Sequence, residues 1–193
     1  MWRSSSHVGT SGGSDPGRVL AGHVRGQTLD EYGTDSGVKV AVAFDHRGVH
    51  LRAAVLEALA VHEVCDLGTD TDAVRVDYPD KACEIGEVIR QGEAERGVLV
   101  CGSGVGAAVA ACKVFGIRAS VCHDSYSAHQ GVEHDDMNVL CLGSEIVGPA
   151  LARELVAAFV GARFNTEEPR YAERLEKVAK MERGMKREQV PST

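Results

Sequence analysis

The sequence predicts a doubly wound, Rossmann-like α/β domain, in which a parallel five-stranded sheet carries helices on both faces. From residue 38 onward, short apolar runs alternate with longer segments of helical pattern, as in repeated strand-helix units. The short runs are apolar throughout rather than at every second residue, which is typical of strands buried on both faces. Both observations favour a parallel sheet between two helical layers.

The first half of the domain starts with a Val- and Ala-rich run at residues 38–45 that predicts a strand. Residues 50–60 (HLRAAVLEALA) follow as a helix, and residues 61–68 (VHEVCDLG) as a short strand. A loop then ends in the sequence DYPD at 77–80, where Asp77 is placed to cap the helix expected at 81–92.

The second half repeats the alternation. The apolar sequence GVLVC at 97–101 predicts a buried strand, and the Ala- and Val-rich residues 107–114 a helix. A strand at 117–122, a helix at 127–134 and a strand at 138–143 come next.

Two helices complete the prediction. Residues 148–160 (GPALARELVAAFV) are apolar enough for a core helix, whereas residues 167–188 are helical by their charged composition, with Pro169 suited to the first turn. Arg170 and Arg174 then lie one helical turn apart on one face. A solvated surface helix explains that spacing, and so does a bidentate grip on a phosphate.

The domain begins after an N-terminal segment of different composition. Residues 1–37 are rich in Ser, Gly and charge and have almost no periodic apolar pattern, which predicts a flexible extension or a start codon placed too early. Residues 38–193 form the remaining unit, a single domain with its C-terminal helix.

Composition excludes several classes of function. A net charge of -7 argues against nonspecific nucleic-acid binding. No apolar run approaches the roughly 20 residues of a membrane span, and the N-terminus lacks the apolar segment of a signal peptide. We therefore expect a cytoplasmic protein that binds neither nucleic acid nor membrane.

The spacing of the cysteines also agrees with a cytoplasmic protein. Six cysteines are scattered through apolar segments without a CxxC pair, which predicts reduced and mostly buried thiols. The histidines and cysteines form no compact ligand cluster, so no metal site is expected. Cys122 and His123 are adjacent in sequence, but a strand end followed by a polar loop explains them.

The segment GVLVCGSGVG at 97–106 is the clearest candidate site. It places Cys101 at the end of a strand and before the N-terminus of a helix, where unpaired N–H groups can bind an anion or stabilise a thiolate. An ordinary glycine-rich turn with an unreactive buried cysteine explains the same residues equally well. Both interpretations stay open on this segment alone.

Ligands of doubly wound sheets bind beyond the carboxyl ends of the strands, so residues that follow strands are the remaining candidates. These are Asp45 and His46, residues 101–106, His123 and Asp124, and Ser144 and Glu145.

A set of ordered motifs resembles one family. They are FDHRG at 44–48, DLGT at 66–69, DYPD at 77–80, CGSGVG at 101–106, GIRAS at 116–120, HDSYSA at 123–128, HDDMNVLCLG at 134–143 and the RYAER spacing at 170–174. Residues 38 to about 182 thereby resemble the ribose-5-phosphate isomerase B family, which includes galactose- and allose-phosphate isomerases. The resemblance implies an aldose–ketose isomerase of a phosphorylated sugar that works through a cis-enediolate without metal or cofactor.

The resemblance also implies roles for residues near the reacting carbons. Cys101 matches the proton-transferring thiol of the cysteine-type members, and Ser103 the hydroxyl that assists at the reacting oxygens. Asp45 and His134 match the pair that opens the sugar ring. The implied anion hole consists of backbone N–H groups from Ser103 to Ala107, and substrate contacts are expected at Gly102, Gly104, Val105 and Gly106.

Phosphate binding is implied for three other residues. His46, Arg170 and Arg174 match phosphate ligands, and a substrate contact is also expected at Asp135, which stands beside His134 where the family has an Asn. In the family the C-terminal helix packs on a neighbouring subunit, so both arginines would reach the partner's site. We therefore expect a homodimer or a dimer of dimers.

The chain departs from the family pattern at several positions. Glu145 stands where an arginine usually follows the last strand, and Arg47 replaces the usual Ala of DHAG. Cys112 replaces an Asn, and Ala107 stands where some members have a glutamate base, which leaves Cys101 as the evident base. Losing an arginine and gaining a carboxylate beside the phosphate would change substrate binding appreciably.

Three alternative functions remain at this point. One is an isomerase of a related tetrose or hexose phosphate, such as erythrulose 4-phosphate, allose 6-phosphate or galactose 6-phosphate. A noncatalytic sugar-phosphate or nucleotide sensor is disfavoured, because Cys101, Ser103, Asp45 and His134 occur together and a sensor needs no base. A dinucleotide-binding domain is weaker still, because no acidic residue is placed to bind a ribose.

Overall fold

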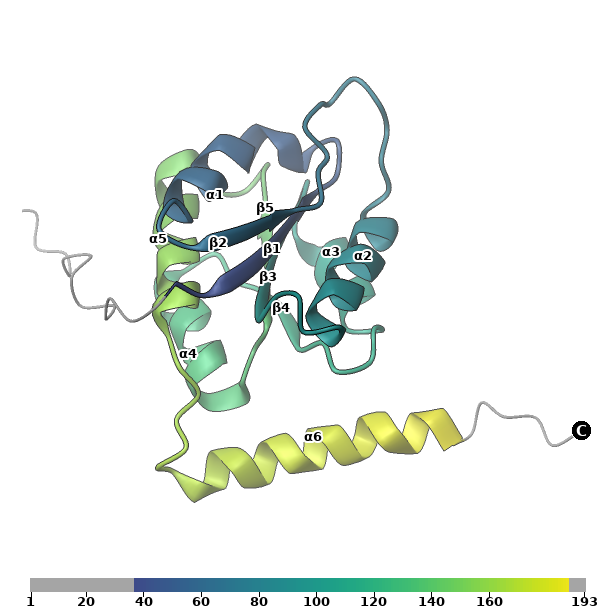
Figure 1. Ribbon diagram of the computed structural model, residues 1–193, viewed down its shortest axis with the longest axis vertical. Helices are drawn as coiled ribbons and strands as arrows, with labels where there is room; N and C mark the ends of the chain where they lie inside the picture. The colour runs from purple at the N-terminus through teal and green to yellow at the C-terminus, as the bar shows by residue number, and fades with distance from the viewer. Residues whose placement is uncertain (1–36, 188–193) are drawn as a thin grey trace, which may run out of the picture.

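A single sheet of five parallel strands forms the centre of the molecule (Figure 1). The computed structural model describes residues 37–187, so the predicted extension at 1–37 lies almost wholly outside the described residues. The strand order is β2-β1-β3-β5-β4. The strands are β1 (Lys39–Phe44), β2 (Glu63–Asp66), β3 (Arg96–Cys101), β4 (Ala119–Val121) and β5 (Val139–Gly143).

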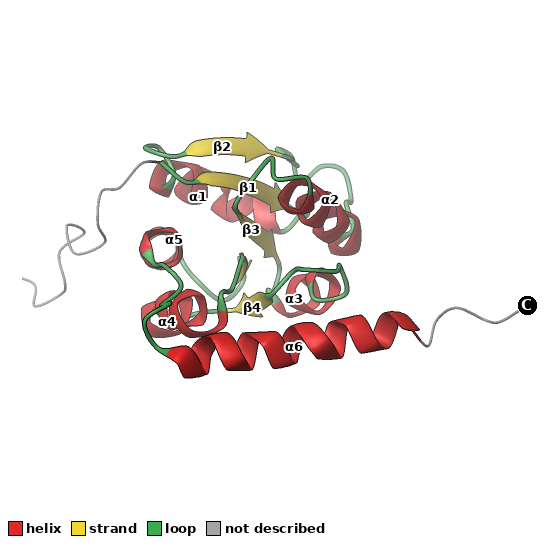
Figure 2. Cartoon of the chain, turned by 60° about the horizontal axis from the view of Figure 1, so that its bottom comes forward, coloured by secondary structure: helices red, strands yellow, loops and turns green. Residues whose placement is uncertain are grey.

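Helices cover both faces of the sheet, which confirms the predicted doubly wound, Rossmann-like fold (Figure 2). One layer packs α1 and α4 against α5, and the other packs α2 against α3. The first layer consists of α1 (Arg52–Ala58), which follows the 3-10 turn η2 (Gly48–Leu51), with α4 (Ser125–Asp135) and α5 (Pro149–Gly161). The second layer consists of α2 (Tyr78–Arg90) and α3 (Val105–Ala111).

The core is split by the sheet, and β3 shows how. Val98 and Val100 belong to the cluster beneath α1, α4 and α5, whereas Leu99 and Cys101 belong to the cluster beneath α2 and α3. Successive side chains of a strand point to opposite faces. Cys101 therefore emerges on the side of the sheet that α2 and α3 cover.

The elements follow the predicted order and differ mainly at their ends. Helix α2 starts at Tyr78 rather than at 81, because Pro79 fits the first turn. Asp77 takes the capping position but its side chain makes no capping hydrogen bond. The predicted strand at 117–122 shortens to β4, and just before this strand the backbone N–H of Arg118 donates to the side-chain Oδ1 of Asn138 at 2.8 Å.

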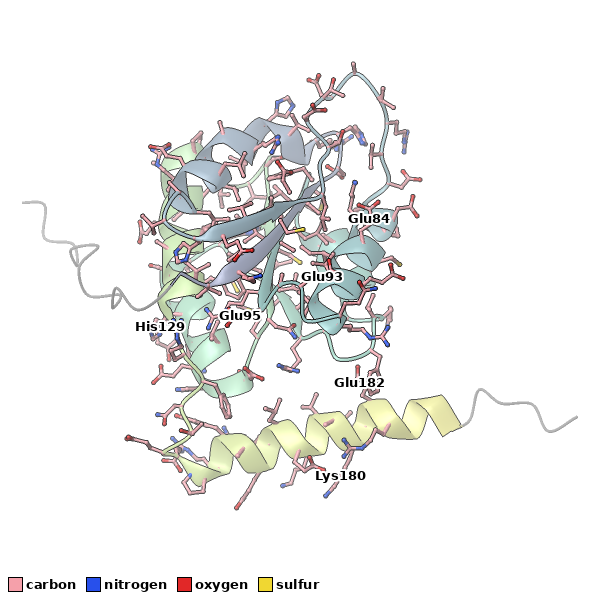
Figure 3. All side chains as sticks on the ribbon, viewed as in Figure 1. Glu84, Glu93, Glu95, His129, Lys180 and Glu182 are labelled. Carbon is pink, nitrogen blue, oxygen red and sulfur yellow. The ribbon has the colours of Figure 1, made fainter. Side chains whose placement is uncertain are left out.

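Helix α6 (Pro169–Arg187) runs across the edge where the strands begin (Figures 1 and 2). It contacts α4 near its start. Farther along, Glu182 points toward the body and accepts a hydrogen bond from the N–H of Gly116 at 2.6 Å, whereas Lys180 points away (Figure 3). Within residues 37–187, no helix is long and apolar enough to cross a bilayer.

A basic group surrounds His62 at this same edge. The N–H of Val38 donates to His62 Nδ1 at 3.2 Å, so Nδ1 is the acceptor and carries no proton. Arg96 caps the end of α5 by donating to the carbonyl of Ala162 at 2.6 Å, and Arg163 donates to the same carbonyl at 3.1 Å. Burial, then Arg163, then Arg96 lower the pKa of His62.

The lowered pKa of His62 predicts a pH-dependent stability. Below about pH 6.5 the unfolded chain binds a proton at this position more readily than the folded chain, so stability rises with pH there. The contribution of His62 is complete above that pH and is lost as the pH falls through the lower folded-state pKa. Urea unfolding between pH 5 and 7.5 is expected to show a smaller pH dependence in His62→Gln than in the wild type.

The control for this measurement is His50→Gln, because His50 is an exposed histidine whose loss leaves the Val38 contact intact. An identical pH dependence in the wild type and His62→Gln would contradict the assignment.

Candidate active site

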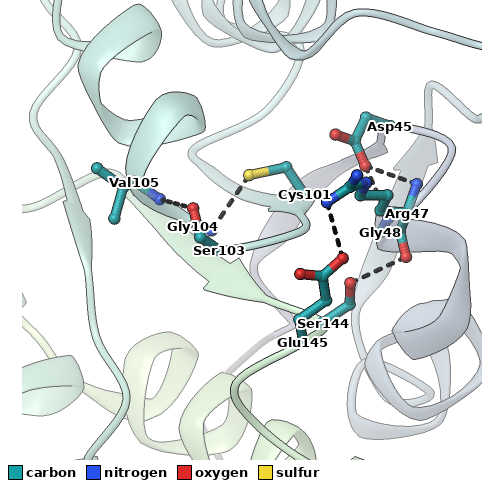
Figure 4. Close-up of polar contacts among 9 residues, drawn as sticks. All are labelled: Asp45, Arg47, Gly48, Cys101, Ser103, Gly104, Val105, Ser144 and Glu145. Carbon is teal, nitrogen blue, oxygen red and sulfur yellow. Dashed lines mark hydrogen bonds and ion pairs between the residues drawn. The ribbon is translucent and has the colours of Figure 1, made fainter.

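The carboxyl ends of β1, β3 and β5 lie side by side at one edge of the sheet. Phe44 pairs with Val100, and Cys101 with Gly143, so the residues that end these strands are level with one another. Asp45 follows β1 directly, and its N–H donates to the carbonyl of Val100 at 3.0 Å. The edge thereby brings together two of the predicted catalytic residues, Asp45 and Cys101 (Figure 4).

The Cys101 thiol is held by the glycine loop that follows it. The N–H of Gly104 donates to Cys101 Sγ at 3.1 Å, and Cys101 is 3% exposed. Gly104 has φ +79°, and a Cβ at that position would lie 3.1 Å from the carbonyl carbon of Leu142. Glycine is therefore required for the turn that aims this N–H at the sulfur. A donor so placed stabilises negative charge on sulfur.

Asp45 is fixed by the loop that follows β1. Its Oδ1 accepts hydrogen bonds from the N–H of Arg47 at 2.9 Å and of Gly48 at 2.7 Å, and the residue is 4% exposed. A Cβ on Gly48 would lie 2.1 Å from the carbonyl oxygen of Val100, so this tight turn needs glycine. The second carboxylate oxygen has no partner among residues 37–187 and is free for a ligand.

Two side chains join the loops after β1 and β5 across the end of β3. Ser144 Oγ donates to the carbonyl of Arg47 at 2.9 Å, and Arg47 Nη1 donates to Glu145 Oε1 at 2.9 Å (Figure 4). A Cβ on Gly102 would lie 3.0 Å from Arg47 Cδ and 3.4 Å from Glu145 Oε1. The ion pair therefore covers Gly102, and the carboxylate at position 145 is not an isolated charge.

The other predicted residues of the glycine loop lie at this edge too. Ser103 Oγ accepts from the N–H of Val105 at 3.3 Å. Two of the predicted anion-hole donors therefore already have acceptors within the loop: the N–H of Gly104 donates to Cys101 Sγ, and that of Val105 to Ser103 Oγ. Gly106 and Ala107 lie in the first turn of α3, where N–H groups have no intrahelical acceptor.

His46 and Tyr78 complete this edge. His46 Nδ1 lies 3.0 Å from the carbonyl of Val76, which ties its ring to the loop before α2. The Tyr78 ring packs on Gly106, because a Cβ there would lie 2.7 Å from Tyr78 Cζ. In the sequence, Tyr78 is marked only by the DYPD motif, and this motif does not indicate that the ring lies at the glycine loop.

The remaining predicted residues lie at the opposite edge. His134 lies in the last turn of α4, shortly before β5 begins, with Nδ1 2.6 Å from Gln130 Nε2 and Nε2 2.9 Å from the Tyr171 hydroxyl. The Tyr171 ring stacks on His134 with centroids 4.1 Å apart, and Arg170 Nη2 donates to the Tyr171 hydroxyl at 3.3 Å. Asp135 and Arg174 are exposed nearby on α4 and α6.

Within one subunit, the predicted residues thus form two separate groups. Asp45, His46, Ser103 and the glycine loop surround Cys101 where the strands end, whereas His134 and Arg170 lie where the strands begin. The length of β5 separates the two groups. The predicted ring-opening pair, Asp45 and His134, does not meet inside a single chain.

The thiols differ in environment, and all six cysteines are free. Cys101, Cys122 and Cys141 are buried, whereas Cys83 and Cys112 are exposed, so burial is less general than predicted. Burial raises the pKa of Cys122 and raises that of Cys141 well above its usual range. Among the described residues, no three His, Cys, Asp or Glu side chains converge as a metal site.

Comparison with known proteins decides the family. Residues 40–178 match the family model described as Ribose/Galactose Isomerase. The chain belongs to the ribose/galactose isomerase family. Its members named below are sugar-phosphate isomerases, so the chain is an enzyme of this class.

Relatives within this family are named for different substrates. The ribose-5-phosphate isomerase B of Escherichia coli is 40% identical over 146 residues, which are 75% of this chain and 96% of that protein. The D-erythrulose-4-phosphate isomerase of Pectobacterium atrosepticum is 34% identical over 129 residues, 66% of this chain and 85% of that protein. The Clostridium thermocellum ribose-5-phosphate isomerase B structure has a TM-score of 0.72 at 38% identity, covering 76% of this chain and 99% of that one.

Proposed function

We propose that this isomerase interconverts ribose 5-phosphate and ribulose 5-phosphate, or a close analogue, with Cys101 as the base. The observation that carries the proposal is the Cys101 thiol at the end of β3, with the Gly104 N–H 3.1 Å from its sulfur and Asp45 directly after the neighbouring strand β1. Family membership supplies the reaction class. The position of the thiol supplies a proton-transfer group at the edge where ligands of such sheets bind.

The proposed chemistry moves one proton between adjacent carbons. The Cys101 thiolate removes the proton from C2 of the open-chain aldose, and the released electron pair forms a C1=C2 double bond while O1 becomes negative. The hydroxyl proton moves from O2 to O1, with the Ser103 hydroxyl beside the oxygens. The thiol then returns its proton to C1, which leaves the carbonyl at C2 and restores the thiolate. N–H groups of Gly106 and Ala107 stabilise the enediolate oxygens.

Ring opening and phosphate binding need the second group of residues. Because His134, Arg170 and Arg174 lie at the far edge of their own sheet, we propose that they act in the site of a neighbouring subunit. His134 of the partner subunit then faces Asp45 across the sugar, and the two arginines hold the phosphate by charge-assisted hydrogen bonds. The functional unit is a homodimer or a dimer of dimers, and each active site contains residues of two chains.

Replacing the thiol tests the base. Cys101→Ser is expected to bind the sugar phosphate as the wild type does while kcat falls by about 10²- to 10⁴-fold, because a hydroxyl is a far weaker base. Kinetics and ligand titration measure the two quantities. Cys83→Ser, which removes an exposed thiol of α2, is the matched control and should retain wild-type kcat. Near-normal turnover by Cys101→Ser would refute the assignment.

Mixing two inactive variants tests the shared site. Arg174→Ala lacks a phosphate ligand and Cys101→Ser lacks the base, so a hybrid dimer contains one site with both defects and one with neither. Unfolding and refolding the mixture is expected to restore up to about a quarter of wild-type activity, because half of the dimers are hybrids with one intact site. A mixture no more active than its parents would mean that Arg174 serves its own chain or no site.

A substrate panel tests the sugar. Relatives named for ribose 5-phosphate and for erythrulose 4-phosphate are 40% and 34% identical to this chain, so a tetrose phosphate is the second candidate. We expect ribose 5-phosphate to give the highest kcat/KM among phosphorylated tetroses, pentoses and hexoses. A higher value for erythrulose 4-phosphate, or for allose or galactose 6-phosphate, would transfer the assignment to that sugar.

A further inference from the structure

The three loops that follow β1, β3 and β5 contain a single lysine or arginine. Residues 45–48, 102–106 and 144–147 together include Arg47 as their only fully charged cation, whereas Arg75 lies in the loop after β2. The same three loops contain the acidic residues Asp45 and Glu145. A phosphorylated ligand over the glycine loop would therefore find one strong cation in these three loops.

The Arg47 side chain lies directly over the glycine loop. It reaches from the loop after β1 across the end of β3, and its Cδ lies 3.0 Å from the position of a Cβ on Gly102. Its Nη1 is held by Glu145 Oε1 at 2.9 Å. The side chain is 59% exposed, and its Nε and Nη2 have no partner among residues 37–187. One edge of the planar guanidinium is thus anchored, while donors on the other edge are available.

We propose that Arg47 binds the substrate phosphate and that Glu145 is a positioning residue that holds the guanidinium over Gly102. This inference rests on the proposed function, because it takes the ligand to be a sugar phosphate. A guanidinium group can donate a hydrogen bond to a carboxylate from one nitrogen and to a phosphate oxygen from the others. Position 47 then supplies the local positive charge, while the ion pair with Arg47 balances the charge of the Glu145 carboxylate.

A different role for Glu145 makes the opposite prediction. If Glu145 acts only as an anion near the phosphate, Glu145→Gln removes repulsion and strengthens phosphate binding. If Glu145 holds Arg47, the same substitution frees the guanidinium to move and weakens binding. The sign of the change therefore distinguishes the two roles.

Calorimetric titration with inorganic phosphate tests the proposal without depending on turnover. Arg47→Ala is expected to weaken phosphate binding by about ten- to a hundredfold, the loss of a hydrogen-bonded charge. As a single substitution, Glu145→Gln is expected to weaken phosphate binding several-fold. In the Arg47→Ala background the same substitution is expected to strengthen phosphate binding, because the Glu145 carboxylate has lost its partner there. The double variant Arg47→Ala/Glu145→Arg is expected to recover most of the affinity.

The control is Arg153→Ala, because Arg153 also forms a partly exposed ion pair, with Glu57 at 3.1 Å, but on α5. It should bind phosphate as the wild type does, and circular dichroism checks that each variant is folded.

Unchanged affinity in Arg47→Ala, or tighter binding in Glu145→Gln alone, would overturn the inference. If the wild type isomerises sugar phosphates while Arg47→Ala binds phosphate normally, only this inference fails. A wild type that neither isomerises sugar phosphates nor binds phosphate would refute the proposed function as well.

Discussion

The parallel pairing of the five strands is the constraint on which the rest of the structure depends. Parallel strands place all carboxyl ends at one edge, so Asp45, Cys101 and Ser144 arrive side by side although they are far apart in sequence. The same geometry sends each connecting helix back to the other edge. His134 at the end of α4 and Arg170 at the start of α6 are therefore kept a sheet's length from the thiol. The proposed two-subunit site follows from that separation.

Backbone groups, more than side chains, organise the edge that holds Cys101. The N–H of Gly104 faces the Cys101 sulfur, and the N–H groups of Arg47 and Gly48 hold the Asp45 carboxylate. Gly48 and Gly104 are needed for different reasons: a Cβ on Gly48 would overlap the carbonyl of Val100, whereas Gly104 has φ +79°. Such preorganised donors need no rearrangement when charge develops in a reaction.

The sequence was sufficient to predict the alternation of strands and helices and the position of Cys101 at a strand end. Both depend on local patterns, namely apolar runs such as 97–101 and the glycines that follow. It could not predict the ion pair of Arg47 with Glu145, because that contact depends on β1 and β5 flanking β3, an order that local pattern does not encode.

The sequence also does not predict the position of Tyr78 or the contacts made by both His134 nitrogens. The Tyr78 ring reaches Gly106 through the packing of α2 against α3, and His134 meets Tyr171 through the docking of α6 on α4. These are tertiary contacts between segments that are separate in sequence, and no spacing rule within either segment predicts them.

A crystal structure with a bound, non-isomerisable phosphorylated sugar acid would test the two-subunit account most directly. In a site shared by two subunits, the atoms corresponding to the reacting carbons are expected to lie within about 3.5 Å of Cys101 Sγ of one subunit. The phosphate is expected to be bound by Arg170 and Arg174 of the partner subunit. A ligand whose sugar and phosphate are both contacted by one chain alone, with no residue of a partner subunit at the site, would contradict the account.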